Sequence, residues 1–153
     1  MKKIYLCHPI STTGEFNDSI RVAEEMEKLG FEVYAPARNK AINDKSNNPT
    51  PQMIYEQDVE RLLEADIIVM NLTGGDSDGT ILEAGILMGM FESNRENLPV
   101  VFAYSSNKRA LQPQHHNGIA SGKLNHMVLG GIDKHFTWCG DEHNTLQRLK
   151  NLV

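Results

Sequence analysis

Residues 66–71, with the sequence DIIVMN, decide the fold class, because four consecutive apolar residues lie between two polar ends. A short apolar run of this kind is typical of a central strand in a parallel sheet, where helices cover both faces. Similar runs predict four further strands, at residues 3–7, 31–35, 98–104 and 136–138. The sequence therefore predicts one sheet of five strands.

The segments between these strands have the spacing of amphipathic helices. In residues 15–29, apolar side chains recur every three or four positions, and Gly30 follows where helices commonly end. Further helices are predicted over residues 51–65, 80–91 and 141–152. This alternation favours an α/β fold, in which a flavodoxin-like five-stranded parallel sheet carries helices on both faces and the chain forms a single domain, residues 1–153.

Composition and net charge limit the classes of partner that the sequence supports. The chain has 153 residues and a net charge of -5, with no cluster of Lys and Arg, so a nucleic acid is a poor candidate and a small, weakly charged substrate a better one. The two cysteines lie far apart, which favours reduced thiols. No apolar run is long enough for a signal peptide or a membrane span, so we expect a cytoplasmic protein.

Several kinds of site have no support in the sequence. Neither a Walker A motif nor a GxGxxG motif follows a strand. No His, Cys or Asp cluster has the spacing of metal ligands, and His115 and His116 are typical of a solvated loop. The sequence therefore supports neither a phosphate-binding loop nor a metal site.

One carboxylate stands out near the carboxyl ends of the predicted strands, where ligands bind in such folds. Between Gly79 and Phe91 the only ionisable side chain is Glu83. We expect it in the first turn of a buried helix, where free N–H groups and the helix dipole favour an anion. It would be held ionised in a dry place, as a nucleophile requires. The alternative is structural, because Thr80 and Glu83 have the spacing of a capping box.

Other candidate groups are expected around Glu83. Asp76 and Asp78 lie in the glycine-rich loop before it, and either could protonate a leaving group or simply shape a tight turn. Asp58 falls on or near the buried stripe of its helix, or else at an exposed edge. Tyr5, in the middle of the first strand, is either a core residue or part of the site.

At this point the chain resembles the nucleoside 2-deoxyribosyltransferases, and the resemblance covers nearly its whole length. The most specific element is the Gly-Thr-x-x-Glu-x-Gly pattern within residues 78–85. The matching segments are 3–6 (KIYL), 54–58 (IYEQD), 65–69 (ADIIV), 78–85 (DGTILEAG) and 125–127 (NHM). Each of the others is weak alone, but their order and spacing are hard to produce by accident.

The resemblance implies a role for each candidate. Glu83 would attack C1′ of a deoxyribose, with Tyr5 orienting it, and a covalent deoxyribosyl-enzyme would pass the sugar to a second base. Asp58 and an aspartate of the glycine loop would contact the base and manage its proton. The remaining substrate-binding residues are expected to be Asn39 in the base pocket, the loop residues Asp76, Ser77 and Gly79, and Asn125 with Met127 from a neighbouring subunit.

The resemblance also implies substrates and assembly. The partners would be deoxynucleosides and free nucleobases, with no metal, organic cofactor, nucleic acid or membrane involved. The protein would form a homo-oligomer, a hexamer or a dimer, with sites shared between subunits. A double displacement that uses a carboxylate as nucleophile and a second group as proton donor agrees with the mechanism of retaining glycosidases.

Three positions depart from the family pattern. Ser77 stands where the family has its loop aspartate, six residues before Glu83, and the related deoxynucleoside 5′-monophosphate hydrolases tolerate serine there. Asn125 counts against that hydrolase group, which carries a small hydroxyl residue at this point. His8 replaces a small residue, and the chain ends in Leu152 and Val153 where some relatives end in an aromatic residue.

Three hypotheses therefore stand at this stage. The first is a base-exchanging deoxyribosyltransferase. The second is an N-glycosidase that hydrolyses 2′-deoxynucleosides or their 5′-monophosphates. The third is a non-catalytic nucleotide-binding module on the same fold.

Overall fold

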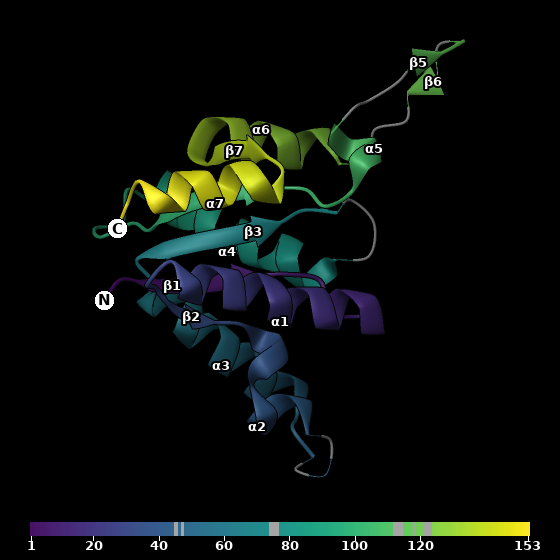
Figure 1. The fold of residues 1–153 in the computed structure, drawn as a ribbon. Helices are drawn as coiled ribbons and strands as arrows, with labels where there is room; N and C mark the ends of the chain where they lie inside the picture. Colours follow the sequence, from purple (N-terminus) through teal and green to yellow (C-terminus); the bar gives the residue numbers. More distant parts are fainter. Residues whose placement is uncertain (45, 47, 74–76, 112–114, 118, 121–123) are drawn as a thin grey trace.

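The computed structural model describes residues 1–44, 46, 48–73, 77–111, 115–117, 119–120 and 124–153. Its centre is a five-stranded sheet in the order β2-β1-β3-β4-β7, with every neighbouring pair parallel (Figure 1). This is the flavodoxin-like order, so the predicted fold class is confirmed. The strands are β1 Lys3–Cys7, β2 Glu32–Tyr34, β3 Ile67–Asn71, β4 Val100–Tyr104 and β7 Thr137–Gly140.

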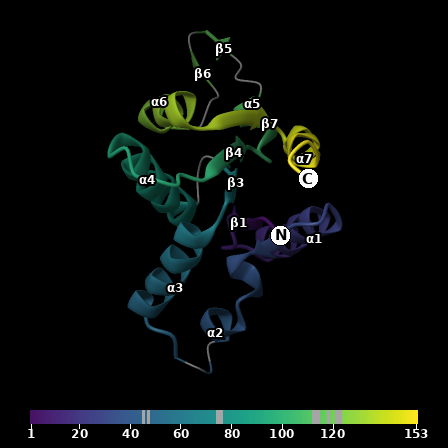
Figure 2. The same ribbon diagram turned by 90° about the vertical axis from the view of Figure 1, so that its left-hand side faces the viewer.

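Helices cover the two faces of this sheet, as Figure 2 shows from the side. Helices α1 Thr13–Lys28 and α7 Glu142–Lys150 cover one face. Helices α3 Pro51–Glu64, α4 Asp78–Glu92 and α6 His126–His135 cover the other. The smaller elements are η1 Pro36–Arg38, α2 Lys40–Asn43, α5 Lys108–Leu111, β5 His115–His116 and β6 Ile119–Ala120.

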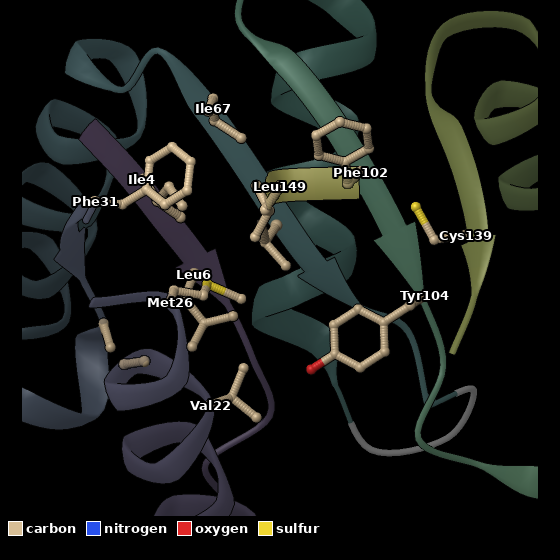
Figure 3. Packing of buried hydrophobic residues seen from close by; sticks show 13 residues of the cluster. Ile4, Leu6, Val22, Met26, Phe31, Ile67, Phe102, Tyr104, Cys139 and Leu149 are labelled. Atoms are coloured by element: carbon tan, nitrogen blue, oxygen red, sulfur yellow. The ribbon is translucent and has the colours of Figure 1, made fainter. Parts of the chain in front are cut away.

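Alternation along the strands divides the core in two. Leu6, Val69 and Tyr104 pack with Val22 of α1 and Leu149 of α7 in one cluster, and Figure 3 labels all of these residues except Val69. The residues next to them in each strand point toward α3, α4 and α6. All five residues of β3 are buried, which explains the unbroken apolar run from which the fold was predicted.

Two local predictions need correction. Helix α4 begins at Asp78 rather than at Thr80, with Ser77 as its N-cap residue. A hydrogen bond from the N–H of Ile81 to the carbonyl of Ser77 closes the first turn at 3.0 Å. The sequence of residues 105–123 is polar and has no helical or strand periodicity, which predicts an irregular segment, but α5 and the antiparallel pair of β5 and β6 lie within it. Among the helices of the described residues, none is long and apolar enough to span a membrane.

Candidate active site

Glu83 lies on α4 over the face of the sheet that carries Tyr5. The hydroxyl of Tyr5, a fully buried residue of β1, donates a hydrogen bond to Glu83 Oε1 at 2.6 Å. Cys7, two residues further along the same strand face, also hydrogen-bonds the carboxylate. Because α4 starts at Asp78, Glu83 lies in the second turn, so the expectation of first-turn N–H groups as its partners is wrong. Side chains from β1 hold it instead.

Burial controls the charge of Glu83. It raises the pKa of this carboxyl from 4.5 to about 7, against the hydrogen bonds from Tyr5 and Cys7, and the negative charge of Asp58 adds to the rise. Burial therefore opposes the expected ionised state of Glu83, whereas the hydrogen bonds from Tyr5 and Cys7 favour it. Burial also raises the pKa of Tyr5 and of Cys7 far above their usual values, so both remain neutral donors.

Asp58 is a half-buried carboxyl group on α3. Burial raises its pKa, while a hydrogen bond from the Tyr34 hydroxyl to Oδ1, 3.0 Å long, opposes that rise. The rings of Tyr34 and Tyr5 are in contact, with centroids 5.3 Å apart and planes tilted by 32°. Glu83, Tyr5, Tyr34 and Asp58 therefore form one cluster. Since the negative charge of Asp58 adds to the rise in the pKa of Glu83, the two carboxyl groups are coupled, and ionisation of one disfavours ionisation of the other.

Tyr34 and Gln57 are members of this cluster that sequence reasoning missed. Asn39 Nδ2 donates to the Tyr34 hydroxyl at 2.9 Å and to Gln57 Oε1 at 3.1 Å, and Asn39 Oδ1 accepts from the N–H of Ala41 at 3.0 Å. The available signal was the IYEQD match, which includes Gln57 but was used for Asp58 alone. The expected base-pocket residue Asn39 thus lies one hydrogen bond from Tyr34.

The residues at the start of α4 have different environments. Ser77 is buried, with 6% of its surface exposed, whereas Asp78 and Gly79 are exposed. Thr80 is the third residue of the helix rather than its cap, so the capping box with Glu83 is absent and that structural alternative is wrong. Asp76, expected to bind substrate, lies outside the described residues.

Asn125 is the N-cap residue of α6, and Met127 is the second residue of that helix. The side chain of Asn125 caps the helix by accepting a hydrogen bond from the N–H of Met127 at 2.8 Å. Met127 is 88% exposed. Exposure of both residues leaves them free to reach a neighbouring subunit, which stays a prediction.

His8, one of the departures from the family pattern, faces α1 on the opposite side of the sheet. Its Nδ1 donates to the carbonyl of Pro9 at 2.7 Å, and its Nε2 accepts from Asn71 Nδ2 at 3.0 Å. The amide orientation of Asn71 follows from the N–H of Ser106, which donates to Oδ1 at 2.9 Å. Asp18 Oδ2 lies 3.3 Å from His8 Nε2. This polar cluster fixes the ends of β1, β3 and β4 and does not touch Glu83.

A cavity of about 850 Å³ runs along the edge strand β2. Tyr34, Asn39 and Gln57 contribute to its lining, together with Arg38 and Arg61, but Glu83 does not. The cavity therefore borders the outer part of the hydrogen-bonded cluster and not the carboxylate expected to attack. Among the described residues, no group of three or more His, Cys, Asp or Glu side chains is placed to hold a metal ion.

The cluster contains the Glu83 carboxylate, which accepts hydrogen bonds from the neutral Tyr5 and Cys7, and a second carboxyl group, Asp58, that can carry a proton. A nucleophile and an acid in one site are the two groups that cleavage of a glycosidic bond requires. The nucleophile must be ionised and the acid must be protonated. A single proton shared by Glu83 and Asp58 can meet both requirements.

The chain is similar to known proteins in sequence and in structure. The sequence model of a family described as nucleoside 2-deoxyribosyltransferase matches residues 4–149. No curated protein matches the chain.

Solved structures with the same fold include three relatives of low sequence identity. A conserved protein from Enterococcus faecalis is 24% identical, with a TM-score of 0.78 and coverage of 100% of this chain and 99% of that one. A 2-deoxyribosyltransferase from Bacillus psychrosaccharolyticus is 17% identical, with a TM-score of 0.61 and coverage of 94% and 90%. A CMP N-glycosidase from Clostridium botulinum is 16% identical, with a TM-score of 0.58 and coverage of 99% and 100%.

Proposed function

The chain belongs to the nucleoside 2-deoxyribosyltransferase family, and from this membership and the site geometry we propose that it transfers 2-deoxyribose between nucleobases through a covalent intermediate on Glu83. The observation that carries the proposal is the Glu83 carboxylate, partly buried on α4 and held at 2.6 Å by the Tyr5 hydroxyl. The hydrogen bond from Tyr5 orients one oxygen of Glu83, and burial limits the water around it. Both effects favour nucleophilic attack by this carboxylate.

The first half-reaction joins the sugar to the enzyme. An oxygen of ionised Glu83 forms a bond to C1′ while the bond from C1′ to the base nitrogen breaks. The electron pair of that bond goes to the base, which takes a proton from Asp58. Tyr5 and Cys7 keep the attacking group aligned, and their neutral donors stabilise its charge before the bond forms.

The second half-reaction reverses these steps with a different base. A ring nitrogen of the incoming base attacks C1′, the ester to Glu83 breaks, and the proton lost by the base returns to Asp58. Two inversions at C1′ give overall retention. The intermediate must be kept from water until a base arrives, and a neighbouring subunit that brings Asn125 and Met127 would provide this cover. The substrates are deoxynucleosides and free bases of a nucleoside salvage reaction in the cytoplasm.

Hydrolysis of the same bond is the second candidate, and Ser77 favours it. This buried serine occupies the place of the family's loop aspartate, a position at which the related deoxynucleoside 5′-monophosphate hydrolases tolerate serine. An N-glycosidase would use the same attack by Glu83 and let water take the place of the second base.

Product analysis distinguishes these activities. The protein is incubated with deoxyinosine, with and without adenine, and the products are separated by chromatography. Deoxyadenosine that forms only with adenine supports transfer, whereas free hypoxanthine and deoxyribose without an acceptor support hydrolysis. A parallel incubation with a 2′-deoxynucleoside 5′-monophosphate tests the second candidate directly. Glu83→Gln, purified in the same way, serves as the control for activity from the expression host. Binding without any product would contradict both candidates.

A further inference from the structure

The hydrogen bonds around Tyr34 have a direction that is set by the backbone. The N–H of Ala41 can only donate, so the atom of Asn39 that faces it at 3.0 Å must be the amide oxygen. The amide nitrogen of Asn39 therefore faces the Tyr34 hydroxyl at 2.9 Å and Gln57 Oε1 at 3.1 Å. Each of its two hydrogens has one acceptor.

This direction continues through Tyr34. An amide nitrogen cannot accept a hydrogen bond, so the Tyr34 oxygen accepts from Asn39. Its single proton is then donated to Asp58 Oδ1, 3.0 Å away. Burial raises the pKa of Tyr34 to about 12, so the phenol keeps this proton at neutral pH. One oxygen of Asp58 is thereby always an acceptor from the protein.

We propose that Tyr34 is a positioning residue that, with Asn39, fixes the acidic proton of Asp58 on Oδ2, the oxygen left free for the departing base. The inference rests on the proposed function, because it assigns a role in protonating the leaving group. A protonated carboxyl group whose Oδ1 accepts from Tyr34 carries its proton on Oδ2. Without the Tyr34 hydroxyl, the proton can occupy either oxygen and the carboxyl group is free to rotate.

The simpler reading is that Tyr34 only packs, since its ring is in contact with the ring of Tyr5. Tyr34→Phe separates these readings, because phenylalanine keeps the ring and removes only the hydroxyl. Tyr55→Phe is the matched control, since Tyr55 lies on α3 with 51% of its surface exposed. The test compares deoxyinosine with 7-methyl-2′-deoxyguanosine, whose cationic base leaves without being protonated.

If Tyr34 positions the acid, Tyr34→Phe lowers kcat on deoxyinosine by about 10-fold or more, a part of the ~10²–10⁴ that general acids contribute. Cleavage of the 7-methyl substrate changes by less than about 3-fold on the same reasoning, because it does not use the acid. Equal losses on both substrates, or no loss on deoxyinosine, would overturn the inference. Wild-type protein that cleaves neither substrate would instead contradict the proposed function.

The pH profile provides a second readout that does not depend on the 7-methyl substrate. The charged and titratable groups that interact with Asp58 are Tyr34 from β2, Tyr5 and Cys7 from β1 and Glu83 from α4, and Arg61 on α3 acts on Tyr34. The Tyr34 hydrogen bond lowers the pKa of Asp58, so its loss moves one limb of the profile of kcat/KM to higher pH. A purely structural role leaves both limbs in place.

Asn39→Asp tests the direction of the hydrogen bonds with the Tyr34 hydroxyl intact. The new carboxylate accepts the proton of Tyr34 and draws it away from Asp58. The same selective loss on deoxyinosine is expected in this variant, and it decides the question if Tyr34→Phe does not fold. An Asn39→Asp protein with unchanged deoxyinosine turnover would overturn the inference.

Discussion

Replacement of Glu83 by glutamine should make the protein more stable at pH 8 and leave its stability nearly unchanged at pH 4.5. A pKa raised from 4.5 to about 7 means that the folded protein binds the Glu83 proton more tightly than the unfolded chain. The contribution of Glu83 to the free energy of unfolding is therefore fully present below pH 4.5 and is lost as the pH rises through about 7. Glutamine has no such dependence, and its oxygen still accepts from Tyr5.

The expected gain follows from the size of this shift. It corresponds to an upper limit of about 3 kcal/mol in the free energy of unfolding at pH 8. Because a small part of Glu83 is still open to solvent, water reduces the effect, and a gain of about 1 to 3 kcal/mol is expected. A gain of this size on removing a functional charge is common for strained active sites.

Urea unfolding at pH 4.5 and pH 8, at one fixed protein concentration, measures this difference. The fluorescence of Trp138, the single tryptophan, follows the transition. Glu92→Gln is the matched control, because Glu92 ends the same helix but lies exposed beside Lys134, which lowers its pKa. That variant should gain nothing at pH 8. An equal change at both pH values for Glu83→Gln, or a loss at pH 8, would refute the electrostatic account of this carboxylate.

Three further predictions concern the reaction itself. Tyr5→Phe should lower kcat by about 10-fold or more, because it removes the hydrogen bond that aligns Glu83 and opposes the rise in its pKa; steady-state kinetics and a pH profile check this. Asp58→Asn should lower kcat on deoxyinosine by about 100-fold or more, because it removes the proposed acid. Asp78→Asn, at an exposed position, should lower kcat by less than about 3-fold. The reverse order would assign the role of proton donor to Asp78. Inactive Asn125→Ala and inactive Glu83→Gln proteins, mixed under conditions of proven subunit exchange, should partly restore activity, and no recovery would argue against sites shared between subunits.

The fold was readable from the sequence because its strongest signals are local. An unbroken apolar run predicts a strand covered on both sides, and β3 is that strand. The start of α4 was misjudged by two residues because Asp78 and Gly79 are typical of a turn, yet here they enter the helix. Glu83 was found for a similar local reason, as a lone charge in an apolar helix.

The partners of Glu83 and Asp58 were harder to predict, since they depend on contacts between distant parts of the chain. Tyr5 and Glu83 are 78 residues apart, and Tyr34 and Asp58 are 24 apart. A tyrosine in a short edge strand gives no periodic signal that distinguishes a core residue from a hydrogen-bond donor. The expected first-turn stabilisation of Glu83 failed for the same reason, because the supporting groups come from β1 and not from the helix itself.

The covalent intermediate offers the most direct test of the account. The protein is mixed with deoxyinosine without an acceptor base, quenched in acid at short times and digested, and its peptides are weighed by mass spectrometry. Because the intermediate waits for a base, the account predicts one added deoxyribosyl group on the peptide that contains Glu83, and none in Glu83→Gln. Turnover of deoxyinosine with no adduct on that peptide at any time, or full turnover by Glu83→Gln, would contradict it.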